Sequence, residues 1–152
     1  MQIGKQMRMN SIFRKETGRS VIVAIDHGGI VGPITGINNP EGLIRDCILG
    51  GADGVLTTRG FARDSLRAFD RELGLIMRLS GGFTVLGGKF EEEIISSVET
   101  ALRYGAIGTA VTVKFGHERE GEFITQASLM ADRCEQWGMP LMIEAMVKGK
   151  DL

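Results

Sequence analysis

The chain has 152 residues, a length that suits one average domain. Its composition, 43% hydrophobic and 24% charged, is that of a globular protein, and a net charge of −1 provides no broad positive field to attract nucleic acid or an anionic membrane. The longest apolar runs, such as residues 21–25, are too short to cross a bilayer, and the polar start of the chain does not resemble a signal peptide. Cys47 and Cys134 stand alone, outside any zinc-binding spacing, so we expect a reducing, cytoplasmic location and no bound metal.

A short helix and a buried strand are expected at the start of the chain. Residues 9–15 can form a helix that Gly18 ends. Residues 21–25 are an unbroken apolar run rich in β-branched side chains, which is typical of a strand buried on both faces of a parallel sheet. Asp26 follows this run directly, and a loop is expected after it.

The next strand–helix units have clear boundaries. Asn39 can cap a helix that Pro40 opens and that residues 50–51, both glycine, bring to an end. Residues 54–57 predict a second strand, and residues 61–69 predict the helix that follows it.

Three further strands are predicted, at residues 73–79, 109–113 and 141–146. Residues 83–88 fit either a small extra strand or a loop. Residues 90–104 have the clearest helical pattern, because apolar side chains recur on one face and three glutamates favour its N-terminus. Another helix is predicted at residues 123–137.

Strands that alternate with helices predict βαβ units and a parallel sheet, either as a barrel or as an open doubly wound sheet. The motifs GxGxxG and GxxxxGK[ST] do not occur in the sequence, which argues against a nucleotide-binding fold.

Polar residues recur where the predicted strands end. In α/β proteins ligands bind beyond the carboxyl ends of the strands, so these residues are the candidates for an active site. They are Asp26, His27, Thr57, Thr58, Arg59, Arg78, Ser80, Lys114, His117, Glu144 and Lys148.

Asp26 and Glu144 are the candidate catalytic carboxylates. Asp26 follows five apolar residues, so part of its surroundings should be dry; it can act as an acid/base, hold a lysine amine, or merely cap the next turn. Glu144 interrupts an apolar strand and shares a face with Met142 and Met146. Such a carboxylate needs either a wet cavity or an ion-pair partner.

His27, Arg59, Ser80 and Lys114 are the candidate substrate-binding residues. His27 should point away from Asp26 if both lie on a strand, and it can equally be a packed histidine. Arg59 and Arg78 can bind an anion or pair with Asp53 or Asp26. Lys114 shares a face with Ala110 and Thr112 and can point inward, but we expect water to reach it.

Several segments, in order and spacing, resemble the archaeal-type class I aldolases. This family includes fructose-bisphosphate aldolase, 2-amino-3,7-dideoxy-D-threo-hept-6-ulosonate synthase and the thiolase that splits 3-hydroxy-5-phosphonooxypentane-2,4-dione. The matching segments are residues 12–13, 17–21, 24–28, 32–36, 51–56, 58–60, 79–82 and 137–141.

The resemblance implies an α/β fold of the (β/α)₈, TIM-barrel type. Complete barrels have ~250 residues, so residues 1–152 would be the N-terminal part of one such domain, with about the first five βα units. It also implies that Asp26 lies in the active site and that a lysine on a sixth strand forms the Schiff base. The chain stops after the fifth predicted strand and contains no match to that lysine.

Besides lacking the Schiff-base lysine, the chain differs from the aldolases at the position of their acid/base residue. The aldolases often carry a tyrosine in a Y-P-R-G segment after strand five, where residues 146–149 here read Met-Val-Lys-Gly. This difference, together with the turn at residues 57–60 and the ending at residues 147–151, looks closer to the thiolase branch.

Two functions are compatible with these features. The first is a class I carbon–carbon lyase that acts on a small phosphorylated sugar or keto compound without metal or organic cofactor, or the related thiolase. The second is a non-catalytic half-barrel that persists as an assembled fragment or homo-oligomer. We expect the 152-residue chain by itself to be inactive.

Overall fold

The computed structural model describes residues 2–70, 72–87 and 91–147. One parallel sheet runs through it in the order β1-β2-β3-β6-β7, so that sheet order follows chain order. Its strands are β1 (Ile22–Ala24), β2 (Gly54–Thr57), β3 (Gly74–Arg78), β6 (Gly108–Phe115) and β7 (Leu141–Val147). The helices that connect them are α3 (Pro40–Leu49), α4 (Arg59–Asp64), α5 (Val98–Arg103) and α6 (Glu120–Trp137).

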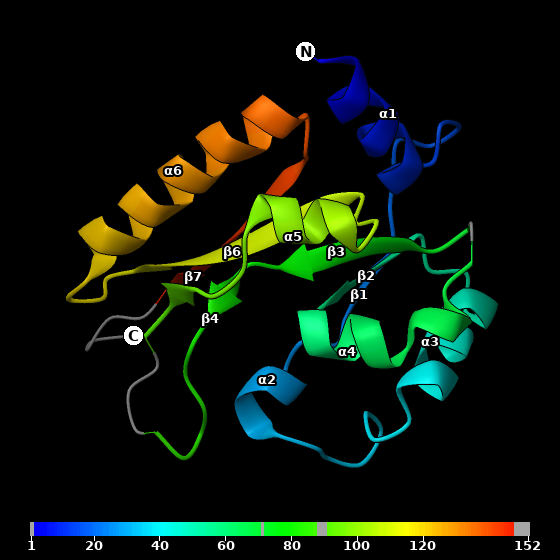
Figure 1. Ribbon diagram of the computed structural model, residues 1–152, viewed down its shortest axis with the longest axis horizontal. Helices are drawn as coiled ribbons and strands as arrows, with labels where there is room; N and C mark the ends of the chain where they lie inside the picture. Colours follow the sequence, from blue (N-terminus) through cyan, green and yellow to red (C-terminus); the bar gives the residue numbers. More distant parts are fainter. Residues whose placement is uncertain (1, 71, 88–90, 148–152) are drawn as a thin grey trace.

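Shorter elements complete the fold (Figure 1). They are α1 (Ile3–Ile12), α2 (Gly28–Val31), the 3₁₀ helix η1 (Leu66–Ala68), and an antiparallel pair formed by β4 (Ser80–Gly81) and β5 (Glu93–Ile94). Within the described ranges, every helix is too short or too polar to span a membrane.

Side-chain caps define where the connecting helices begin. The carboxamide oxygen of Asn39 accepts a hydrogen bond from the backbone N–H of Gly42, and Pro40 occupies the first turn of α3, as the sequence predicts. Thr58 caps α4 in the same way. After α3 and α5, Gly51 and Gly105 adopt φ values of 75° and 74°, a left-handed conformation that ends each helix before the next strand starts.

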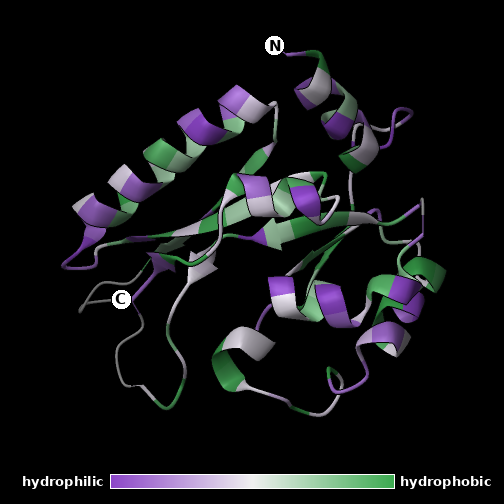
Figure 2. Cartoon of the chain, viewed as in Figure 1, coloured by the Kyte–Doolittle hydropathy of each residue, from purple (hydrophilic) through white to green (hydrophobic). Residues whose placement is uncertain are grey.

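The sheet separates two apolar layers. On the outer side, helices α3 to α6 cover the strands, and side chains such as Met77, Val111 and Phe123 are fully buried between them. On the inner side, Leu56, Ile76 and Ala110 form a smaller cluster. Figure 2 shows that the strands are mostly apolar, whereas hydrophilic and apolar residues alternate along the helices. The two layers arise because neighbouring residues on a strand face opposite sides.

The prediction that the first strand is buried on both faces is wrong. Ala24 is exposed, and Val21, which precedes β1, retains 52% of its surface. The reason is position: β1 pairs with β2 on one side and is an edge of the described sheet. The apolar run at residues 21–25 therefore forms a strand that remains partly exposed at the edge of the described sheet.

Four predicted helices have different bounds in the structure; the one expected at residues 123–137 is α6, which begins earlier, at Glu120. The first helix is α1, which ends at Ile12 because Arg14 turns toward Asp53 and the Gly51 carbonyl. The helix predicted at residues 61–69 is divided into α4 and η1 at Ser65, whose hydroxyl donates back to the Phe61 carbonyl.

The long helix predicted at residues 90–104 is also wrong; only α5, Val98–Arg103, is helical. Ser97 caps this helix at its start by accepting from the Thr100 N–H. Residues 93–94 instead pair with β4, and the Ile95 N–H donates to the Leu79 carbonyl. Residue 90 lies outside the described residues. Non-local pairing thus overrides a local helical pattern.

Candidate active site

A pocket of about 350 Å³ opens at the carboxyl ends of the strands. It contains side chains that come from strand ends far apart in the sequence. Its lining includes Asp26, His27, Thr58, Arg78, Ser80, Phe83, Glu92, Ile95, Thr112, Lys114, Glu144 and Met146. All of the predicted catalytic and substrate-binding residues except Arg59 are therefore brought together here.

Arg78 connects the two candidate catalytic carboxylates. Its Nε and Nη2 lie 2.6 and 2.5 Å from Oδ2 of Asp26, and its Nη1 lies 2.9 Å from Oε2 of Glu144. Nη1 also donates to the Thr112 hydroxyl at 2.6 Å, and that hydroxyl donates to Glu144 at 2.7 Å. The Arg78 side chain is 10% exposed, so these are buried, charge-assisted hydrogen bonds.

The same contacts determine the charge states in the bridge. Burial opposes the positive charge of Arg78, but Asp26 and Glu144 outweigh it and raise the pKa of the guanidinium above its ordinary value. Burial would likewise raise the pKa of Glu144. Hydrogen bonds from Thr112 and Arg78 outweigh burial and hold the pKa of this carboxyl below its usual range. Glu144 is therefore a carboxylate at neutral pH.

Lys114 does not lie where water reaches it, contrary to the sequence-based expectation. It is 2% exposed, and its Nζ lies 3.5 Å from Oε1 of Glu92, which is itself 5% exposed. The ammonium also sits 4.3 Å from the centre of the Phe83 ring. Glu92 belongs to the segment before β5, which the sequence predicts to be helical. In the structure this segment covers Lys114.

The remaining candidates differ in how they relate to the pocket. His27 borders it together with Asp26. Because β1 ends at Ala24, neither residue is on a strand, so the strand alternation behind the expectation that they point apart does not apply. Ser80 is 3% exposed and its hydroxyl accepts from the Thr112 backbone N–H, so it braces β6. Arg59, the first residue of α4, is exposed and lies outside the pocket lining.

Sequence reasoning missed Glu92, Thr112 and Phe83. Thr112 was recognisable, since it shares the inner face of its strand with Lys114 and Ala110. The sequence offered Arg78 either as an anion-binding residue or as a partner of Asp26, and the structure pairs it with Asp26. Glu92 carried no such signal, because its place depends on the pairing of β4 with β5.

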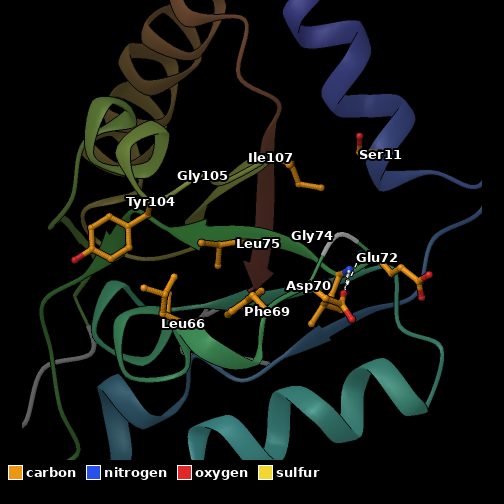
Figure 3. A pocket seen from close by; sticks show the side chains of 12 residues that line it. Ser11, Leu66, Phe69, Asp70, Glu72, Gly74, Leu75, Tyr104, Gly105 and Ile107 are labelled. Carbon is orange, nitrogen blue, oxygen red and sulfur yellow. Dashed lines mark hydrogen bonds between the residues drawn. The ribbon is translucent and has the colours of Figure 1, made fainter.

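A second pocket, of about 250 Å³, lies at the amino ends of the strands (Figure 3). Leu66, Phe69 and Tyr104 border it beside Leu75, and Asp70 accepts hydrogen bonds from backbone N–H groups of the turn that leads into β3. Among the residues that the structure describes, its lining contains no lysine, arginine or histidine. This pocket lacks the convergent charged groups of the carboxyl-end pocket.

Comparison with known proteins bears on both fold and chemistry. A family model for the DeoC/LacD family aldolases matches residues 20–152. The 2-amino-3,7-dideoxy-D-threo-hept-6-ulosonate synthase 1 of Archaeoglobus fulgidus is 30% identical over 147 residues, which are 97% of this chain and 55% of that protein. The 3-hydroxy-5-phosphonooxypentane-2,4-dione thiolase of Yersinia enterocolitica is 32% identical over 149 residues, which are 98% of this chain and 50% of that protein. The chain thus spans about half the length of these curated relatives.

Comparison with solved structures agrees with the match to the aldolase family model. A Schiff-base-forming fructose-1,6-bisphosphate aldolase superposes with a TM-score of 0.81 at 28% identity, covering 97% of this chain and 60% of that one. A fructose-bisphosphate aldolase from Slackia heliotrinireducens, at 15% identity and a TM-score of 0.76, shares the fold. The expected α/β fold of the (β/α)₈, TIM-barrel type, incomplete in this chain, is confirmed.

Proposed function

This chain belongs to the DeoC/LacD aldolase family, and we propose that it supplies the first five βα units of a class I carbon–carbon lyase. The substrate would be a small phosphorylated sugar or keto compound. Residues 1–152 would be the N-terminal part of a single barrel domain. The remaining strands, and the lysine that forms the Schiff base, would come from sequence beyond these residues.

One observation carries the proposal: two carboxylates from the first and fifth strand ends meet in one pocket. Asp26 and Glu144 are 118 positions apart in the sequence (144 − 26), yet both contact the same guanidinium. Acid/base groups that converge beside an open pocket are what cleavage of a carbon–carbon bond next to an iminium requires.

Each pocket residue has a role in this proposal. The Asp26 carboxylate would orient the incoming amine or exchange a proton with it, and Glu144 would accept protons from substrate hydroxyl groups. Lys114, Ser80 and His27 would contact or position the substrate. Arg59, which lies outside the pocket, has no part in the chemistry proposed here.

The thiolase reaction is a second candidate, and a specific position favours it. Met146 borders the pocket near the end of β7, in the segment where the aldolases often carry the tyrosine acid/base. A thioether cannot donate a proton as a phenol does. Acyl transfer from a phosphorylated diketone to a thiol acceptor would need a different proton path from retro-aldol cleavage.

The first test is turnover by the complete barrel after Asp26→Asn. We expect the rate of cleavage to fall roughly 10²-fold, the range for loss of a positioned acid/base, with the fold retained. Ketose phosphates and phosphorylated diketones, the latter with and without a thiol acceptor, would be assayed in parallel to separate lyase from thiolase activity.

Asp132→Asn is the matched control, because Asp132 is exposed on α6. It should leave turnover unchanged. Full activity of the Asp26→Asn enzyme would remove Asp26 from the chemistry.

A further inference from the structure

Arg78 stands at the middle of the described sheet but contacts carboxylates from both of its edges. It ends β3, the central strand in the order β1-β2-β3-β6-β7. Asp26 follows β1, and Glu144 is part of β7. Neighbouring strands lie ~4.8 Å apart, so in a flat sheet each edge would be roughly 10 Å from β3. One side chain reaches both carboxylates because the sheet curls around it.

The details of the contacts show a shared cation rather than two separate ion pairs. Nε and Nη2 both approach the same oxygen of Asp26, Oδ2, at 2.6 and 2.5 Å. Nη1 is left for Glu144, at 2.9 Å, and for Thr112. The fork of arginine permits this division, whereas the single ammonium of a lysine cannot reproduce it.

We propose that Arg78 is a positioning residue, whose guanidinium contacts Asp26 and Glu144 together and holds both carboxylates in their productive places. This inference rests on the proposed function, because it assigns Arg78 a task in the same pocket. Arg78 itself would contact no reacting atom. Its positive charge is paired with the two carboxylates, so it would not serve as the binding site for a substrate phosphate.

The pocket has other charged groups, and their positions bear on any pH dependence. Those that line it besides Arg78 come from the segment after β1, from the segment before β5, from β6 and from β7: Asp26 and His27, Glu92, Lys114, and Glu144. Lys114 is engaged by Glu92 at 3.5 Å, and it also favours the ionised form of Glu144. Among the described residues, removal of Arg78 therefore leaves Lys114 as a weaker cationic influence on Glu144.

The direction of the pH effect follows from the contacts. Arg78 and Thr112 lower the pKa of Glu144 in the folded protein, so loss of Arg78 should move that pKa upward. In kinetics, the acid limb that reports a required carboxylate should move to higher pH. A residue that served only to support the fold would change the melting temperature without moving this limb.

The experiment compares Arg78→Met, Arg78→Lys and the exposed control Arg67→Met in the complete barrel. The titration of Glu144 would be followed by ¹³C-carboxyl NMR, with Glu144→Gln used to assign its resonance. We expect the pKa of Glu144 to rise in Arg78→Met and to stay nearer the parent value in Arg78→Lys, which retains the charge. The kcat of Arg78→Lys should still fall, by roughly 10- to 100-fold, because the carboxylates are no longer held together.

Thr112→Val serves as a second variant where Arg78→Met does not fold. It removes the hydroxyl that donates to Glu144 but keeps the guanidinium, so it should raise the same pKa. An unchanged Glu144 titration in these variants would overturn the positioning role. Borohydride trapping of dihydroxyacetone phosphate on the parent tests the proposed function separately, because the NMR titration requires no turnover.

Discussion

The two ends of the same sheet differ in what the strands present to their pockets. At the amino ends, the pocket of Figure 3 is bordered by Leu66, Phe69 and Tyr104. Asp70 and Glu72 also line it, and Asp70 accepts hydrogen bonds from a turn. At the carboxyl ends, buried charges from several strands converge within hydrogen-bonding distance. The pockets are of similar size, about 250 and 350 Å³, so size does not distinguish them.

The transition from apolar to charged takes place within each strand. On the inner face of β3, Ile76 is followed two residues later by Arg78; on β6, Ala110 is followed by Thr112. On β7, Met142 is followed by Glu144. The first residue of each pair closes the interior of the curled sheet with apolar contacts. The second, two positions nearer the carboxyl end of the strand, is polar or charged. In barrel enzymes the carboxyl end carries the chemistry and the amino end contributes stability.

The largest effect we expect is on stability, from Lys114→Met. This substitution leaves Glu92 as a carboxylate that is 5% exposed and lacks its ammonium. Breaking one partner of a buried pair costs about 3–5 kcal/mol. Urea unfolding of the parent and the variant would measure the loss. Adding Glu92→Gln should recover a large part of it.

The control for this prediction is an ion pair far from the carboxyl-end pocket. Lys5 on α1 contacts Glu135 on α6, and both side chains are partly exposed, at 30% and 54%. Lys5→Met should therefore cost much less than Lys114→Met, since exposed pairs contribute little. Equal losses for the two variants would contradict the view that the carboxyl-end charges are buried and interdependent.

A smaller effect is expected on the association state of the 152-residue chain. β1 and β7 are the edges of the described sheet, and Ile143 and Val147 on β7 expose 52% and 69% of their surfaces. Unpaired strand edges favour pairing with another chain. We expect self-association in sedimentation experiments at micromolar concentration, which would be in line with the predicted homo-oligomer.

Charges on β7 should weaken this association. The double variant Ile143→Lys and Val147→Lys is expected to shift the chain toward monomer, whereas Leu129→Lys, on the exposed side of α6, should not. A compact, stable monomer for the parent chain would argue against exposed edges as the cause of association.

Much of the fold could be predicted from the sequence because it depends on local signals. The helix opened by Asn39 and Pro40 and the strand at Gly54–Thr57 appear where the sequence places them. The residues that gather at the carboxyl ends were also found this way, since parallel strands bring their ends to one edge of the sheet. The alternation of strand residues correctly placed Glu144 on the inner face with Met142.

What could not be predicted depends on contacts between distant segments. The burial of Lys114 requires Glu92 and Phe83 to fold over it, and three consecutive glutamates had favoured a helix at that point. The alternate glutamates, Glu91 and Glu93, instead contact Arg119 in the loop after β6. No local pattern indicates that arrangement. Lys148 and Lys150, which the sequence offers as further amines, lie outside the described residues.

The most direct test of the central claim is to locate the amine that forms a Schiff base. Dihydroxyacetone phosphate and borohydride would be applied to the complete barrel and to the 152-residue chain, followed by mass spectrometry of the peptides. We expect an adduct in the complete barrel on a lysine outside residues 1–152, and none in the shorter chain. Lys114 should remain unmodified in both, because it is 2% exposed and its Nζ is held 3.5 Å from Glu92, out of reach of the substrate carbonyl. A stable adduct on Lys114 would contradict this account and would place the nucleophile on β6.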